Sequence, residues 1–216
     1  MCGRFTLTVD DVARLARQWG AEVDAALAAA WRPRFNVAPG NGHLVLQQED
    51  GRRRLAPARF GLAGPAGMLI NARAETAATR LTFREAWRTG RTAVPADGFF
   101  EWEGPASARR PTWFHRPGSR PFLLAALLGP APDGGLGFAI LTTSARAPVA
   151  ALHDRMPVVL PEPLLGAWLT GEPPALPATE DGAFAARPVS PWVNAVEHDD
   201  AACLEAEGPP RQGSLF

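Results

Sequence analysis

Apolar residues at helical spacing dominate the first part of the chain. They recur every three to four positions over residues 10–31, and Asp10 stands where an N-cap residue is expected. The second half of this stretch is rich in alanine, and Gly20 interrupts it. The pattern predicts an amphipathic helix over 10–31 that breaks near Gly20.

Strand-like runs account for most of the middle of the chain. Residues 32–62 hold short apolar runs separated by turn residues at 39–42 and at Asp50–Gly51, which predicts strands and a hairpin. Similar runs, divided by proline and glycine, cover 91–103, 111–116, 121–128 and 137–145.

Two further helices complete the pattern. Residues 76–89 form an amphipathic stretch ended by Gly90, and 161–171 predict a short helix with proline near its start. We therefore expect one α+β domain over 2–195, with a mainly antiparallel sheet and helices packed on it. An acidic, proline-containing tail over 196–216 is expected to be partly disordered, and Cys203 within it receives no role.

Composition excludes several classes of protein. The 216 residues are 46% hydrophobic and 20% charged, which is neither a disordered nor a membrane composition. The longest apolar run, over 121–130, is too short to span a bilayer, and residues 1–20 lack the apolar core of a secretory signal. We expect a cytoplasmic protein. Its two cysteines, Cys2 and Cys203, lack the partners of a zinc site or a disulfide framework.

Charge is balanced overall but not along the chain. Residues 1–120 hold 18 arginines and 11 acidic residues, a net charge of +7, whereas the remainder holds 4 and 11, a net charge of −7. A local basic surface for an anionic partner is consistent with this division, and so are solvated arginines scattered over the surface.

The chain contains no lysine, because all 22 basic residues are arginine. The α-amine at the N-terminus is then its only primary amine. Met1 precedes a small residue, the situation in which aminopeptidases remove it, so we expect Cys2 to become the first residue. A free α-amine and a thiol would then stand on adjacent carbons.

Three segments carry side chains suited to chemistry. Asn71, Arg73 and Glu75 alternate at the end of an apolar strand and can share one face, although such residues more often cap the next helix. Glu101 stands between aromatic residues, which raise the pKa of a carboxyl group toward the range of acid–base catalysis, although a solvent-facing strand residue has the same signature. His153 is a lone histidine, and such residues are more often structural than catalytic.

Taken together, these segments resemble the SRAP family, the SOS response-associated peptidases. The resemblance runs in order from residue 2 to about residue 195, and it is carried by MCGRF at the N-terminus, RFNVAPG at 34–40, INARAET at 70–76, ADGFFEW at 96–102, LTTSA at 141–145, HDRMPVVL at 153–160 and PVSPWVN at 188–194. It implies a single SRAP domain with a barrel-like β core and a basic DNA groove, and neither metal nor cofactor. Family members shield abasic sites in single-stranded DNA.

The resemblance also implies residue roles. The N-terminal Cys2 would form a covalent thiazolidine with the lesion, Asn71 would orient the ring, Glu101 would act as the acid–base group, and His153 would stabilise the sugar hydroxyl. The implied DNA-binding residues are Arg4, Asn36, Pro39, Arg73 and Arg155, with the arginines on phosphates. The implied partner is therefore single-stranded DNA with abasic sites, held by a monomer that would join the nucleoid when bound.

One departure from the family pattern lies before Asn71. Family members usually have a tryptophan-bearing stretch there, whereas this chain reads RFGLAGPAGMLINAR. Pro39 remains the candidate apolar wedge beside the lesion.

Two other functions remain open from the residues alone. Cys2 with His153 and Glu101 could form an N-terminal-nucleophile cysteine peptidase, whose leader would be Met1 alone. A non-catalytic single-strand binder would instead use the arginine-rich half and need no cysteine.

Overall fold

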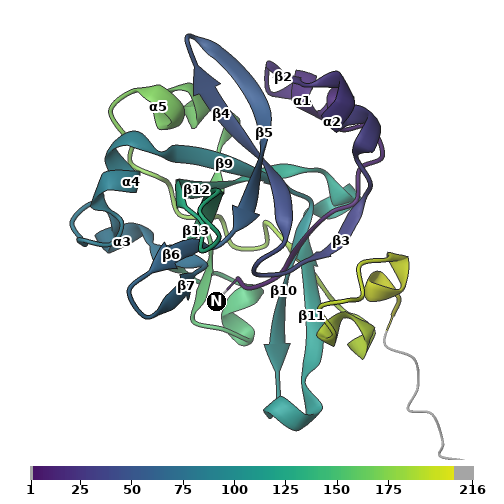
Figure 1. Cartoon of the computed structure of the whole chain (residues 1–216). Helices are drawn as coiled ribbons and strands as arrows, with labels where there is room; N and C mark the ends of the chain where they lie inside the picture. Colours follow the sequence, from purple (N-terminus) through teal and green to yellow (C-terminus); the bar gives the residue numbers. More distant parts are fainter. Residues whose placement is uncertain (1, 207–216) are drawn as a thin grey trace, which may run out of the picture.

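The computed structural model describes residues 2–206, which form two β-sheets surrounded by short helices (Figure 1). The strands of the larger sheet are, in spatial order, β14 (Arg155–Pro157), β13 (Leu136–Ser144), β12 (Phe122–Pro130), β9 (Arg91–Ala96), β4 (Gly42–Glu49), β5 (Arg52–Phe60) and β2 (Ala21–Val23). Two short strands join this sheet outside that order: β15 (Val159–Leu160) pairs with β12, and β8 (Asn71–Arg73) pairs with β13. Because β5 also pairs with β13, this sheet closes on itself. The predicted barrel-like core of an α+β fold is confirmed.

The smaller sheet carries much of the site described below. Its strands are β16 (Ala185–Pro188), β11 (Arg110–His115), β10 (Gly98–Glu103), β1 (Phe5–Leu7) and β3 (Arg34–Val37), in that spatial order. A separate hairpin joins β6 (Leu62–Gly64) to β7 (Gly67–Leu69). Most pairings in both sheets are antiparallel, as the turn-rich sequence predicts.

Helices lie around the closed sheet. They are α1 (Val12–Gln18), α2 (Ala25–Ala30), α3 (Ala74–Ala77), α4 (Arg84–Thr89) and α5 (Leu165–Thr170), with 3-10 turns η1 (Ala106–Ala108), η2 (Pro117–Ser119), η3 (Val149–Ala151), η4 (Glu162–Leu164), η5 (Pro191–Asn194) and η6 (Ala201–Leu204). In Figure 1, α1 and α2 stand beside β2 on one side, and α3, α4 and α5 stand on the other. None of the helices within residues 2–206 is long and apolar enough to cross a membrane.

Strand β12 explains why the run over 121–128 is apolar at every position. Leu123, Ala125 and Leu127 belong to one buried cluster, whereas Leu124 and Ala126 belong to another. Successive side chains of a strand point to opposite faces, so both faces of β12 are covered. The core therefore lies on both sides of the closed sheet.

The helix expected over 10–31 breaks at Gly20 as predicted, but residues 21–23 form a strand instead of continuing the helix. Asp11, rather than Asp10, caps α1 by accepting a hydrogen bond from the Arg14 N–H. Gly20 follows the end of α1 and adopts a left-handed conformation, with a φ of 62°. Residues 21–23 then form β2, which pairs in parallel with β5. Asp24 restarts the helix as α2. Pairing with an unfilled sheet edge outweighs the modest helix propensity of three residues.

The helix expected over 76–89 also divides. It forms α3 and α4, and the Thr79 hydroxyl between them donates to the Thr76 carbonyl in the manner that competes with helix formation. The strand expected over 91–103 divides as well, because the buried Asp97 accepts hydrogen bonds from Thr6 and Thr8. The chain thereby passes from β9 in the larger sheet to β10 in the smaller one.

Residues 196–206 pack against the domain instead of forming a loose tail. The Asp199 carboxylate accepts from the backbone N–H groups of Phe35 at 2.6 Å and Asn36 at 2.8 Å, and it pairs with Arg34. Cys203 is fully buried in a cluster that includes Phe100. The expected domain boundary at residue 195 therefore lies inside packed structure. Residues 207–216 lie outside the described residues.

Candidate functional site

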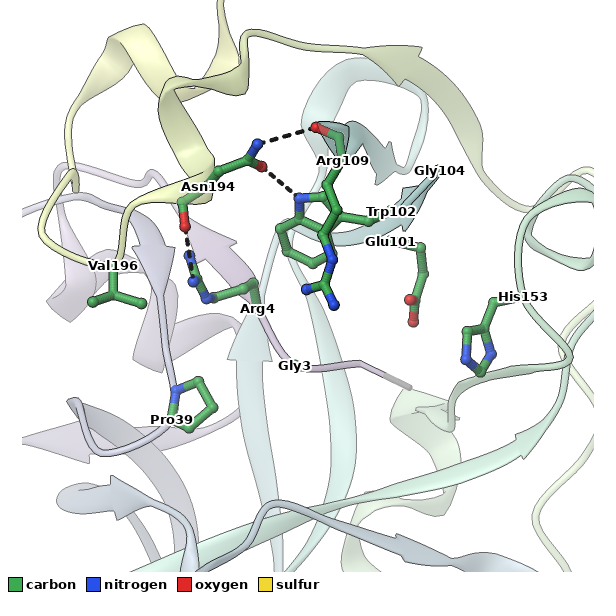
Figure 2. A pocket seen from close by; sticks show the side chains of 10 residues that line it. All are labelled: Gly3, Arg4, Pro39, Glu101, Trp102, Gly104, Arg109, His153, Asn194 and Val196. Carbon is green, nitrogen blue, oxygen red and sulfur yellow. Dashed lines mark hydrogen bonds between the residues drawn. The ribbon is translucent and has the colours of Figure 1, made fainter. Parts of the chain in front are cut away.

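A pocket of about 740 Å³ opens beside β10 (Figure 2). Its lining comes from segments that are far apart in the sequence: Gly3, Arg4, Pro39, Glu101, Trp102, Gly104, Arg109, His153, Asn194 and Val196. Four of the predicted site residues are therefore brought together here. In Figure 2, Glu101 and His153 lie beside each other at one end, whereas Arg4, Trp102, Arg109 and Asn194 gather at the other.

Strand β10 presents Glu101 to the pocket. The strand lies between β1 and β11, and Gly98 at its start has no room for a side chain, because a Cβ would stand 2.0 Å from the Trp113 indole nitrogen. The Glu101 side chain is buried, and this burial raises the pKa of its carboxyl group. A carboxyl group with a raised pKa can both donate and accept a proton near neutral pH.

His153 is oriented by the backbone that follows it. Its Nδ1 accepts the Arg155 N–H at 2.9 Å, so the neutral ring carries its proton on Nε2. The same Nδ1 lies 3.0 Å from the Asp154 carboxylate, to which it could donate only if it carried the proton, and it then could not accept the Arg155 N–H. That carboxylate is 86% exposed and contributes little, so the backbone bond fixes the ring.

Cys2 lies behind the pocket lining, next to Gly3. It is fully buried against the core cluster of Phe5, and its carbonyl accepts a hydrogen bond of 3.0 Å from Asn71 Nδ2. Burial raises the pKa of the Cys2 thiol well above its ordinary range, and the Glu101 carboxylate raises it further. The Asn71 Oδ1 is also buried and has no hydrogen-bond partner within residues 2–206. An unused acceptor therefore stands beside Cys2.

Arg4 forms one wall and is itself tightly held. Its guanidinium donates to Asn36 Oδ1 at 2.8 Å and to the carbonyls of Val193 at 2.9 Å and Asn194 at 3.3 Å, and it lies 5.7 Å from the Trp102 ring centre. Asn36, which was predicted to contact DNA, has no exposed surface in this structure. Asn36 is fully buried, and its amide donates to backbone carbonyls of residues 193–198, so it supports Arg4 instead.

Arg73 and Arg155 lie outside the pocket lining, on strands that flank β13. Arg73 is exposed. The Arg155 side chain is only 14% exposed and pairs with Glu75. Of the two predicted phosphate ligands, Arg73 is therefore the more accessible to DNA.

Comparison with known proteins identifies the family of this chain. The profile of the family described as SOS response associated peptidase (SRAP) matches residues 1–196. The chain belongs to the SRAP family. Among its relatives, the abasic site processing protein YedK of Escherichia coli is 34% identical, over 95% of this chain and 99% of YedK. The abasic site processing protein YoqW of Bacillus subtilis is 32% identical, over 78% of this chain and 80% of YoqW.

Two solved structures share the fold of this chain. A phage-related protein from Bordetella bronchiseptica is 30% identical, with a TM-score of 0.67 over 87% of this chain and 94% of that one. A protein from Bacteroides thetaiotaomicron has a TM-score of 0.76 over 95% of this chain and 99% of the other. The latter is 16% identical and shows the fold alone.

Sequence reasoning missed part of the SRAP pocket. Trp102, Arg109 and Asn194 are joined by two hydrogen bonds, from the Trp102 indole to Asn194 Oδ1 at 2.7 Å and from Asn194 Nδ2 to the Arg109 carbonyl at 3.0 Å. Trp102 and Asn194 lie within the motifs that carry the family resemblance, but nothing in those motifs pairs them. The only sequence feature that pointed to Arg109 is its place in the basic first part of the chain, residues 1–120.

Proposed function

We propose that this SRAP protein processes abasic sites in single-stranded DNA by forming a covalent thiazolidine through Cys2. The observation that carries the proposal is the grouping of Glu101 and His153 in one pocket beside Cys2, whose carbonyl is anchored by Asn71. Relatives of similar length, including YedK, are named abasic site processing proteins. Removal of Met1, which lies outside the described residues, would free the α-amine of Cys2.

The chemistry proceeds in two bond-forming steps. The abasic deoxyribose opens to an aldehyde, the α-amine of Cys2 attacks the aldehyde carbon, and the carbinolamine hydroxyl leaves as water to give an imine. The thiol sulfur then adds to the imine carbon, and its proton passes to the nitrogen, which closes a five-membered ring. One water is released for each crosslink, and no oxidant or reductant is consumed.

The state of the thiol favours the amine as the first nucleophile. The reactive form of a cysteine is its thiolate, and burial raises the pKa of Cys2 so that the thiol stays protonated at neutral pH. An α-amine has a pKa near 8 and is partly neutral there. The same burial weighs against the cysteine peptidase alternative, which requires a thiolate as the first nucleophile.

Glu101 and His153 have separate tasks in this scheme. Protonated Glu101 supplies the proton that the departing hydroxyl takes, and its carboxylate can then accept the thiol proton. His153, with its proton on Nε2, donates a hydrogen bond to the sugar hydroxyl that ring opening releases. The buried Oδ1 of Asn71 is a suitable acceptor for the N–H of the finished ring.

The proposal predicts a one-to-one adduct that survives denaturation. Trimmed protein incubated with an abasic single-stranded oligonucleotide should migrate on a denaturing gel as one shifted band, and the same oligonucleotide without the lesion should give none. The non-catalytic binder predicts no shifted band with either oligonucleotide. A form that retains Met1 has its amine one residue too far from the thiol, so an adduct of normal yield on that form would contradict the α-amine route.

Arg73 is proposed to contact a backbone phosphate, because it is exposed on the strand end that also carries Asn71. Arg73→Ala should weaken non-covalent binding about equally for all DNA sequences. The log–log salt dependence should become shallower by about 0.7, the value for one phosphate on a single strand. Salt titrations in a Cys2→Ala background measure this without crosslinking. Arg14→Ala, which removes an exposed arginine from α1, is the matched control, and equal slopes for both variants would remove Arg73 from the interface.

A further inference from the structure

Glu75 and Arg155 form a two-pronged ion pair beside the site. Arg155 donates to the two Glu75 carboxylate oxygens, from Nη1 and from Nη2, at 2.8 Å each. The Glu75 side chain is 47% exposed, whereas the Arg155 side chain is 14% exposed. The carboxylate therefore covers the accessible end of the guanidinium group.

The remaining donors of Arg155 are mostly committed or hidden. Its Nη2 also donates to the Thr142 carbonyl at 2.6 Å, and its Nε is buried without a hydrogen-bond partner within residues 2–206. A guanidinium binds a phosphate best through two parallel N–H groups. The pair of N–H groups at the accessible end is the pair that Glu75 occupies, so a phosphate can bind there in this manner only by displacing the carboxylate.

Arg73 approaches the same carboxylate from the opposite edge of β13. Thr142 of β13 pairs with Arg73 of β8 on one side and with Pro157 of β14 on the other. The pKa of Glu75 is lowered first by the hydrogen bond from Arg155, and the charges of Arg155 and Arg73 also lower it. The Glu75 carboxylate thus interacts with the charges of both arginines proposed to bind phosphate, and it accepts from Arg155 the two hydrogen bonds that a phosphate would accept.

We propose that Glu75 occupies a phosphate site and competes with the DNA backbone for Arg155, so that it sets the affinity of this protein for single-stranded DNA. The inference rests on the proposed function. When DNA binds, the Glu75 carboxylate gives up both hydrogen bonds, and a backbone phosphate takes them. Without the lesion, the affinity gained from Arg155 is reduced by the cost of that exchange. Binding to intact single strands is therefore held weak, and retention at an abasic site depends on the covalent bond.

Glu75→Gln tests the proposal directly. The amide keeps the size of the side chain but removes the charge that holds Arg155. Affinity for an intact fluorescent oligothymidylate, measured by anisotropy in the Cys2→Ala background, should rise about threefold to fivefold at low salt, at the upper end of the range for a partly exposed ion pair. The log–log salt dependence should become steeper by about 0.7, because one more phosphate is contacted.

Glu85→Gln is the matched control. Glu85 forms a similar two-pronged pair with Arg88, but both side chains are about 70% exposed, and the pair lies within α4. This variant makes the same change in net charge and should alter affinity by about twofold or less. Glu75→Gln combined with Arg155→Ala should lose the gain, because the freed guanidinium is gone.

Two results would overturn the proposal. Weaker binding by Glu75→Gln would mean that Glu75 positions Arg155 for DNA, and an effect equal to that of Glu85→Gln would mean that only net charge matters. Circular dichroism melting of each variant checks that it is folded. The proposed crosslink is tested by a separate measurement, the yield of adduct between the unsubstituted protein and abasic DNA. A failure of the crosslink proposal can therefore be distinguished from a failure of the proposed competition between Glu75 and DNA for Arg155.

Discussion

Cys2→Ala should abolish the adduct that survives denaturation while leaving the protein able to form an imine with abasic DNA. Alanine keeps the α-amine but has no sulfur to close the ring, and an imine hydrolyses when the protein unfolds. We expect the yield of stable adduct to fall at least about 100-fold, the loss that removal of a covalent group produces. Borohydride, which reduces an imine to a stable amine, should restore a shifted band. The measurement is a denaturing gel run with and without borohydride.

The second cysteine supplies the control. Cys203 is as fully buried as Cys2, but it belongs to a different cluster, beside Val193. Cys203→Ala removes one buried sulfur as Cys2→Ala does, and it should leave the adduct yield unchanged. If Cys2→Ala gives a stable adduct without borohydride, the thiol takes no part in the linkage. If borohydride traps nothing, the α-amine does not attack the sugar.

Glu101→Gln should slow crosslinking by about 100-fold, the usual contribution of a positioned proton-transfer group. The variant should also change the pH dependence of the single-turnover rate. Burial raises the pKa of Glu101, and its protonated form is present below that pKa and lost as pH rises through it. In the unsubstituted protein the rate should therefore stop rising once pH passes the Glu101 pKa. In Glu101→Gln it should continue to rise up to the α-amine pKa near 8.

Glu103→Gln provides the comparison for this prediction. Glu103 lies on the same strand, two residues further on, but its side chain is 46% exposed and pairs with Arg110. Its substitution should leave both rate and pH profile as they are. Equal rates for Glu101→Gln and the unsubstituted protein across the pH range would reduce Glu101 to a structural carboxylate.

The strands and the site differ in how far the sequence predicts them. Apolar runs such as that over 121–128 could be assigned to strands because their pattern is local. The helix expected over 10–31 is interrupted at residues 21–23, because β2 pairs there with β5, a strand distant in the sequence, as Ala21 does with Arg53. The local pattern of apolar residues contains no information about pairing between strands that are distant in the sequence.

The same limit applies to the site. Glu101 and His153 could be nominated because their motifs resemble those of a known family, and the structure brings both into one pocket. The burial of Asn36 could not be predicted, because it depends on carbonyls of Val193, Ala195 and His198. Nor could the Glu75 pair with Arg155, since polar residues 80 positions apart give no sign of contact.

The contacts of Arg4 have a consequence for folding. Arg4 precedes the residues that hold its guanidinium by almost the whole domain, because the guanidinium donates to the carbonyls of Val193 and Asn194. Contacts that span so much of the chain form late, because the intervening loop must close before they bring any gain. A nascent or truncated chain that lacks residues 190–199 would carry its reactive end without the pocket around it. The pocket that holds Glu101 and His153 is therefore complete only in molecules that have finished folding.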